Sequence, residues 1–352
     1  MRMQETSGWR RGLAVAAAAL FAQGTSLHAQ QDPPVPAAIE RAAGELATLL
    51  AEQCPLAPAS DIAAFERCRD GLRSSEALRA RLPEIVLGGR QPADPRATLA
   101  TSTLTQFAPE VWTQLYAPLF MFNGRYRLEW VPQENQYLLR LEAAFRNRLP
   151  PGQYPTPFWH DAQKWRTYQH ANGVLLWLQP QTGRVHVAQV TNRAGTPALQ
   201  EVETIARRFD GRWLWTDDGG RMQPAVTAFD GMYRPENPFL PKLDRQYRDL
   251  ALHLSEAQCT KCHAPDNPQH MQRQVLLATP AHAAGEIDRL IRAVREDRMP
   301  MDANRRPVAL SPDAKAWLLQ SATAFRDTVR AARAWESPAA SAAAPAEPEA
   351  AE

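Results

Sequence analysis

The sequence has little excess charge of either sign. Its 352 residues include 40 Lys and Arg against 38 Asp and Glu, which gives a formal net charge of +2. Loss of an N-terminal leader would remove Arg2, Arg10, Arg11 and Glu5, so the remaining chain is close to neutral. The strong basic field that nucleic-acid binding relies on is lacking, and no nucleic-acid partner is expected.

Long apolar runs are also lacking. The N-terminal run Gly12–Ala22 is shorter than the roughly 20 apolar residues that a spanning helix needs. It follows a basic stretch ending in Arg10 and Arg11 and precedes the small residue Ala29, as in a secretory signal peptide. We therefore expect residues 1–29 to be a signal peptide of the Sec type, cleaved on export to the periplasm. No transmembrane segment is expected after cleavage, and a single membrane anchor is the alternative.

Glycine is scarce relative to proline: 17 glycines stand against 30 prolines, which indicates many turns and stiff connections. The length suits two or three domains. The residue patterns predict a multidomain α+β chain. We expect a helical N-terminal region and linker over 30–120, an antiparallel β domain over 121–235, an all-α domain over 236–335 and a disordered tail over 336–352.

Cysteine occurs only four times, and two of the four lie far from the others. Residues 36–83 have apolar side chains at helical spacing, in two segments that predict a helical hairpin, with Ser60 or Asp61 as the second N-cap. Cys54 ends the first segment and Cys68 lies inside the second. In an exported protein this pair predicts a disulfide, with two buried free thiols as the alternative.

The middle of the chain has the alternation of β-strands. The runs "GRYRLEWV" and "QYLLRLEAAF" are separated by the turn signal "PQEN", and residues 173–191 read as a second hairpin. Residues 84–105, rich in Pro, Gly, Ala and Thr, read as a linker or irregular segment. An aromatic insert contains Trp159, His160 and Asp161. His160 is a candidate acid/base, although such aromatics commonly plug the open end of a sheet and such a histidine is commonly a surface residue.

The most specific motif is the segment "CTKCH", Cys259 to His263. A dithiol redox pair needs its CxxC at a helix N-terminus after a strand, whereas this motif follows a helical segment. Structural zinc needs four ligands, and no second cysteine pair has matching spacing. Covalent haem attachment needs what is present: two thiols three residues apart and a histidine directly after the second. The motif therefore predicts one haem c, with Cys259 and Cys262 as its thioether tethers and His263 as an axial ligand to iron.

Residues 242–334 resemble a class I c-type cytochrome domain. The matching features are a helix before the motif, Pro265 after it, a short helix over 286–296, the tripeptide "RMP" at 298–300 and a long last helix from "LSPD". The resemblance covers about a quarter of the chain, and none is recognised for the remainder. It implies an all-α cytochrome c fold in which the first and last helices cross beside the haem.

The resemblance also implies a methionine as the second axial ligand. Met299 matches the family's ligand position, and Pro300 stiffens the loop that presents the sulfur. A thioether fills the last iron site, so such a haem passes electrons rather than binding substrates. Met301 is the nearest alternative. Further candidates are Met271, His253, His270 and His282.

The sequence therefore predicts a periplasmic electron-transfer protein with one His/Met-ligated haem. Its partner would be another redox protein, such as an oxidase, a dehydrogenase or a cytochrome. Lys261, Arg298, Arg305 and Arg306 would steer an acidic partner if they line the haem edge, and they are ordinary solvated charges if they do not. Two alternatives stay open: a haem enzyme with an open or labile sixth site, and a haem-containing sensor or binding protein that uses the β domain.

Overall fold

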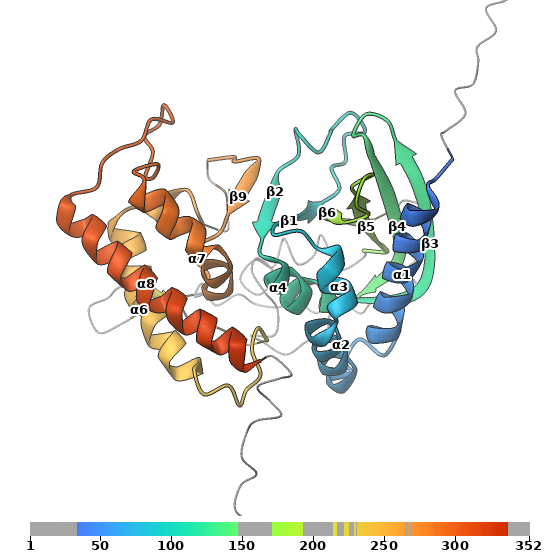
Figure 1. Cartoon of the computed structure of the whole chain (residues 1–352), viewed down its shortest axis with the longest axis horizontal. Helices are drawn as coiled ribbons and strands as arrows, with labels where there is room; N and C mark the ends of the chain where they lie inside the picture. Colours follow the sequence, from blue (N-terminus) through green and yellow to red (C-terminus); the bar gives the residue numbers. More distant parts are fainter. Residues whose placement is uncertain are drawn as a thin grey trace, which may run out of the picture. The chain divides into compact units, whose positions relative to one another are not determined.

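A computed structural model describes residues 34–146, 171–192, 214–216, 222–224, 229, 231–264, 267 and 269–336. Val35–Glu352 belongs to one compact unit. Its architecture is α+β, with N-terminal helices, a central seven-stranded mixed sheet and C-terminal helices (Figure 1). The expected signal peptide, the aromatic insert with Trp159, His160 and Asp161, and Pro265 all lie outside the described residues.

The N-terminal region forms the predicted helices, α1 (Ala37–Gln53) and α2 (Ile62–Ser74), followed by the short helix α3 (Glu76–Arg81). Asp61 is the N-cap of α2, because its side chain accepts a hydrogen bond from the backbone N–H of Ala64. The predicted Cys54–Cys68 disulfide is confirmed, and both cysteines are fully buried. A cross-link that closes a loop of this size contributes about 3 kcal/mol to stability.

The main sheet has the strand order β3-β4-β5-β6-β1-β2-β9. The two predicted hairpins are confirmed and form adjacent parts of it. The strands are β1 (Val86–Arg90), β2 (Leu104–Phe107), β3 (Phe120–Val131), β4 (Gln136–Phe145), β5 (Gly173–Leu178), β6 (Val185–Thr191) and β9 (Arg273–Val275).

Two of these strands correct the expectation of a linker over 84–105. Strand β1 lies in that stretch, β2 begins in it at Leu104, and the two pair with each other. The sequence did not predict β1 because the strand contains glycines, which have a low strand propensity. Gly88 has a packing reason: a Cβ atom there would stand 2.5 Å from Cε2 of Phe107, so the aromatic ring occupies the space a side chain would need.

The sheet is mixed, which corrects the prediction of a purely antiparallel one. Strand β1 runs parallel to β6, and β2 runs parallel to β9. The sheet therefore extends beyond residues 121–235 at both ends of the sequence. Because β9 comes from the C-terminal part, that part is not purely helical as expected. Two further short strands, β7 (Leu214–Thr216) and β8 (Met222–Pro224), pair outside the main sheet.

A short irregular helical segment joins β2 to β3. It consists of α4 (Pro109–Val111), a π-helical turn η1 (Trp112–Tyr116) and a 3₁₀ turn η2 (Ala117–Leu119). Among the described residues, no helix combines the length and hydrophobicity needed to cross a membrane.

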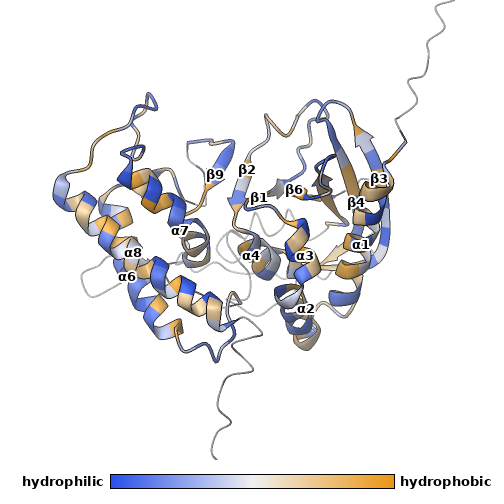
Figure 2. Ribbon diagram, in the orientation of Figure 1, coloured by the Kyte–Doolittle hydropathy of each residue, from blue (hydrophilic) through white to orange (hydrophobic). Residues whose placement is uncertain are grey.

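The C-terminal helices are α6 (Leu240–Glu256), α7 (Pro280–Arg295) and α8 (Pro312–Trp335), which lie together in Figure 1. Each carries both hydrophobic and hydrophilic residues (Figure 2). Ser311 caps α8 through its hydroxyl. The apolar stripes of α6 and α8 are buried, and the rings of Tyr247 and Phe325 lie 5.9 Å apart.

The structure describes one residue of the predicted disordered tail. Glu336, placed in the predicted disordered tail, is the C-cap of α8. Its carboxylate accepts hydrogen bonds from the backbone and guanidinium of Arg234 and from the amide of Asn237, at 2.9 to 3.0 Å. These contacts fasten the end of α8 to the segment before α6. Residues 337–352 lie outside the described residues.

Candidate functional site at the CTKCH segment

The backbone after α6 brings the two thiols of the motif to one side of a tight turn. Gln258 has a left-handed φ of 60°, which ends the helix and starts the 3₁₀ turn η3 (Cys259–Lys261). The backbone N–H groups of Cys262 and His263 donate to the Cys259 carbonyl at 3.2 and 3.0 Å. Side chains three residues apart in a 3₁₀ turn eclipse each other. Cys259 and Cys262 therefore share a side, and both are free thiols.

The imidazole of His263 is held by one nitrogen. Its Nδ1 lies 2.9 Å from the Val275 carbonyl oxygen in β9. Because a carbonyl only accepts, Nδ1 carries the proton and the lone pair resides on Nε2. Burial lowers the pKa of His263, which keeps the ring neutral near pH 7. Histidines that bind metals almost always donate their other ring N–H to such an acceptor, so this arrangement fits an iron ligand.

The backbone of His263 is fixed as firmly as its ring. Its carbonyl accepts hydrogen bonds from the N–H groups of Leu277 and Ala278, at 3.0 and 3.3 Å. Strand β9 therefore holds the side chain of the histidine, and the segment that follows β9 holds its main chain. The sequence did not predict this acceptor strand, because three residues give no usable alternation signal.

The thiols do not have the character of a redox dithiol. Burial raises the pKa of Cys259 to about 11, whereas a reactive CxxC cysteine has a lowered pKa. In the described part of the chain, no three His, Cys, Asp or Glu side chains form a group able to hold a metal ion. The two free thiols and one neutral imidazole, whose Nε2 has no hydrogen-bond partner among the described residues, fit the residues needed for covalent haem.

The two candidate methionine ligands differ in exposure. Met299 is half-buried, whereas Met301 is 43% exposed. Both lie in the loop between α7 and α8, where the N–H of Val308 donates to the Pro300 carbonyl at 2.8 Å and Met301 bridges to Pro307. The loop is further tied by Asp302, whose carboxylate accepts from two backbone N–H groups. The burial favours Met299, which stays a prediction.

The alternative ligand candidates have other roles or surroundings. His282 is buried, with Nε2 at 2.9 Å from the Tyr116 hydroxyl and Nδ1 at 2.6 Å from the Thr279 hydroxyl. Both of its ring nitrogens are occupied, which leaves none for iron. His270 is exposed and Met271 is half-buried. His253 lies near Glu256, with Nδ1 3.4 Å from the carboxylate.

The burial of His282 makes the stability of the protein sensitive to acid. Burial lowers its pKa from an ordinary 6.5 to about 3. At pH values between these two, His282 binds a proton in the unfolded chain but not in the folded chain. The contribution of His282 therefore leaves the free energy of unfolding at its maximum above about pH 6.5. We expect the free energy of unfolding to fall by roughly 1.4 kcal/mol per pH unit below that, until about pH 3.

Urea unfolding between pH 7 and pH 4 measures this dependence. A His282→Gln variant should lose about that slope, while the exposed control His270→Gln should keep it. Unchanged pH dependence in His282→Gln would contradict the assignment.

The C-terminal part of the chain contacts β2 and the helical segment after it through several polar groups. The N–H of Leu104 donates to the Gln272 carbonyl at 2.8 Å, extending the β2–β9 pairing. The Gln106 amide donates to the buried carboxylate of Glu286 at 3.1 Å. The Tyr116–His282 hydrogen bond and an ion pair between Arg333 and Glu110 add to these. The motif itself meets the sheet through the contact of His263 with Val275 in β9.

The four basic residues expected to line the haem edge differ in their pairing. Arg298 forms an ion pair with Glu296 at 2.8 Å, and Lys261 donates to the Gln258 side chain at 2.8 Å. Arg305 and Arg306 are exposed in the methionine loop. Two of the four charges therefore already have polar partners within the chain.

Comparison with protein-family models, with curated proteins and with solved structures finds no match to this chain.

Proposed function

We propose that the chain is a periplasmic monohaem c-type cytochrome that transfers electrons. Cys259 and Cys262 would tether the haem, His263 would bind the iron through Nε2, and Met299 would be the second axial ligand. The observation that carries the proposal is the hydrogen bond from His263 Nδ1 to the Val275 carbonyl, beside two free thiols on one turn. We propose in addition that residues 236–335 adopt a class I cytochrome c fold.

Each residue of the site has a distinct role in this proposal. A haem bound by an imidazole and a thioether supplies one-electron redox chemistry. Val275 fixes the ring orientation of His263 and would raise the basicity of the nitrogen that binds the metal. Leu277 and Ala278 restrain the histidine backbone, so the ligand would have little freedom to move between oxidation states. The methionine loop, tied by Asp302, would supply the sulfur.

The proposed partner is a redox protein of the same compartment. Arg305 and Arg306 are exposed, and no ion-pair partner is found for them among the described residues, so they are the charges best suited to guide an acidic partner. The buried Cys54–Cys68 disulfide agrees with an oxidising compartment. We expect the rate of association with this partner to fall as the ionic strength rises.

Spectra of the exported protein, made in a host that attaches haem to periplasmic proteins, test the proposal. We expect a low-spin spectrum in both oxidation states and, in the oxidised protein, the charge-transfer absorption of a methionine–iron bond. The reduced protein should not bind carbon monoxide, because both axial sites are filled. A high-spin haem that binds carbon monoxide would favour the haem-enzyme alternative. A chain exported without covalent haem would overturn the proposal.

A further inference from the structure

The two faces of the sheet are covered differently. Tyr137, Leu139 and Leu141 of β4 belong to the main core with the buried side of α1, while Leu138 belongs to a smaller apolar cluster. Alternate residues of a strand point to opposite faces, so Arg140 lies on the same face as Leu138. Beside the smaller cluster this face is hollowed into a cavity of about 720 Å³.

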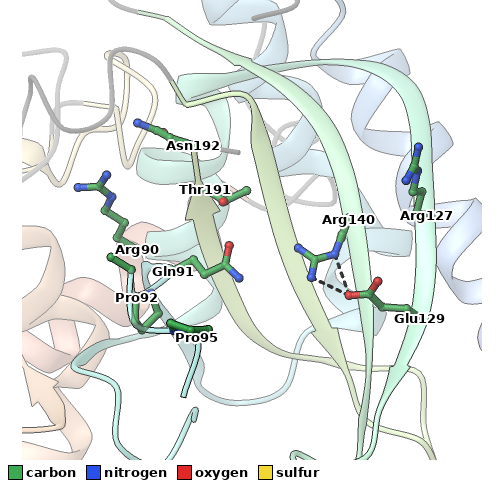
Figure 3. A pocket seen from close by; sticks show the side chains of 10 residues that line it. Arg90, Gln91, Pro92, Pro95, Arg127, Glu129, Arg140, Thr191 and Asn192 are labelled. Atoms are coloured by element: carbon green, nitrogen blue, oxygen red, sulfur yellow. Dashed lines mark hydrogen bonds and ion pairs between the residues drawn. The ribbon is translucent and has the colours of Figure 1, made fainter. Parts of the chain in front are cut away.

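Positive charge predominates in the lining of this cavity. Among the described residues that line it, three are arginines, Arg90, Arg127 and Arg140, and one is acidic, Glu129. Glu129 is engaged by Arg140, with Nε and Nη2 at 2.8 and 2.6 Å from one carboxylate oxygen (Figure 3). In the described part of the chain, no ion pair involves Arg90 or Arg127. The lining therefore carries two more positive than negative side chains.

The register of β3 and β4 makes this excess of positive charge energetically unfavourable. Arg127 stands directly opposite Arg140 in the antiparallel β3–β4 pair. Like charges in that relation destabilise a sheet, and one carboxylate does not neutralise two guanidinium groups. The chain as a whole is nearly neutral, so the arginines are not part of a generally basic surface. An anion bound between them would relieve the repulsion.

The remaining lining residues suit the binding of a small organic molecule. Gln91 and Thr191 add neutral hydrogen-bonding groups, and Figure 3 shows Gln91 and Arg140 pointing toward each other. Pro92, Ala93 and Pro95 form an apolar wall. The volume lies within the roughly 300–1,000 Å³ of typical ligand sites. We propose that this cavity binds a small organic anion, whose carboxylate or phosphate group contacts the arginines.

Calorimetric titration of the mature holoprotein at low ionic strength tests this site. The probes are inorganic phosphate, succinate and the neutral analogue succinamide. We expect saturable binding of at least one anion to one site and none of succinamide, and the tighter anion identifies the head group. Arg90→Gln and Arg127→Gln should each weaken binding by about tenfold or more, as expected for the loss of a charge-assisted hydrogen bond. Glu129→Gln should strengthen it several-fold, because it releases Arg140.

Arg41→Gln is the matched control. It removes the same charge from an exposed position on α1, which packs on the other face of the sheet. Its affinity should equal that of the unaltered protein. Saturable binding of neither anion, or an equal loss in Arg41→Gln, would overturn the proposal. The site does not depend on the haem, and covalent haem in the same samples reports on the proposed function separately.

Discussion

A Cys259→Ser/Cys262→Ser double variant is expected to lose covalently attached haem completely. A thioether bond forms through sulfur, and a serine hydroxyl does not replace the thiol in that bond. The two residues lie three apart at one 3₁₀ turn, so in the proposed site both thiols would reach the same edge of one porphyrin. Haem staining after denaturing electrophoresis and the intact mass of the exported chain measure the loss.

Two matched controls separate attachment from folding. Thr260→Ala alters a spacer between the cysteines and should retain full haem staining. A Cys54→Ala/Cys68→Ala variant removes the other two cysteines, which form the disulfide, and should lose stability but keep its haem. Covalent haem in the Cys259→Ser/Cys262→Ser variant, or its loss in Thr260→Ala, would refute the assignment of the tethers.

Substitution of Met299 should have the second-largest effect. Met299→Ala removes the sulfur proposed to fill the sixth site, so the haem becomes high-spin and open to carbon monoxide. The reduction potential should fall on the order of 0.1 V or more, since axial ligands shift haem potentials over a range of about 0.8 V. Potentiometric titration and the loss of the methionine–iron absorption measure these changes.

Met301→Ala is the paired control, because the two methionines are separated by a single proline in the same loop. With its side chain 43% exposed, Met301 should be replaceable with little change in potential or spectrum. If Met301→Ala instead opens the haem and Met299→Ala does not, the ligand assignment is reversed. If neither variant changes the spectrum, a methionine at this loop is not the ligand.

The sequence was sufficient for features set by neighbouring residues. Helices α1, α2, α6 and α8 have apolar positions at helical spacing, with caps such as Asp61 and Ser311 at their starts. Both hairpins have local turn signals. The Cys54–Cys68 pairing was predictable because both cysteines lie in one helical hairpin. In each case the deciding interactions lie within a few residues of one another or within one hairpin.

Features that depend on distant pairing were not predictable. Strand β1 contains Gly88 and Gly89, and its role appears only when the Phe107 ring is placed against it. Strand β9 has three residues, and its parallel partner β2 precedes it by well over a hundred positions. For the same reason the motif predicted His263 as a ligand but not the Val275 carbonyl that orients it. The cavity arginines come from three separate strands and form no local pattern.

The pairing of β9 with β2 has a consequence for dissecting the chain. A fragment that begins at Leu240 would keep the three C-terminal helices, the CTKCH segment and both methionines. It would also leave β9, which holds the His263 acceptor, as an unpaired sheet edge, and remove Tyr116 from the buried His282. Exposed strand edges are templates for aggregation. The smallest piece that preserves the surroundings of His263 therefore includes β2 and η1, far upstream of the motif itself.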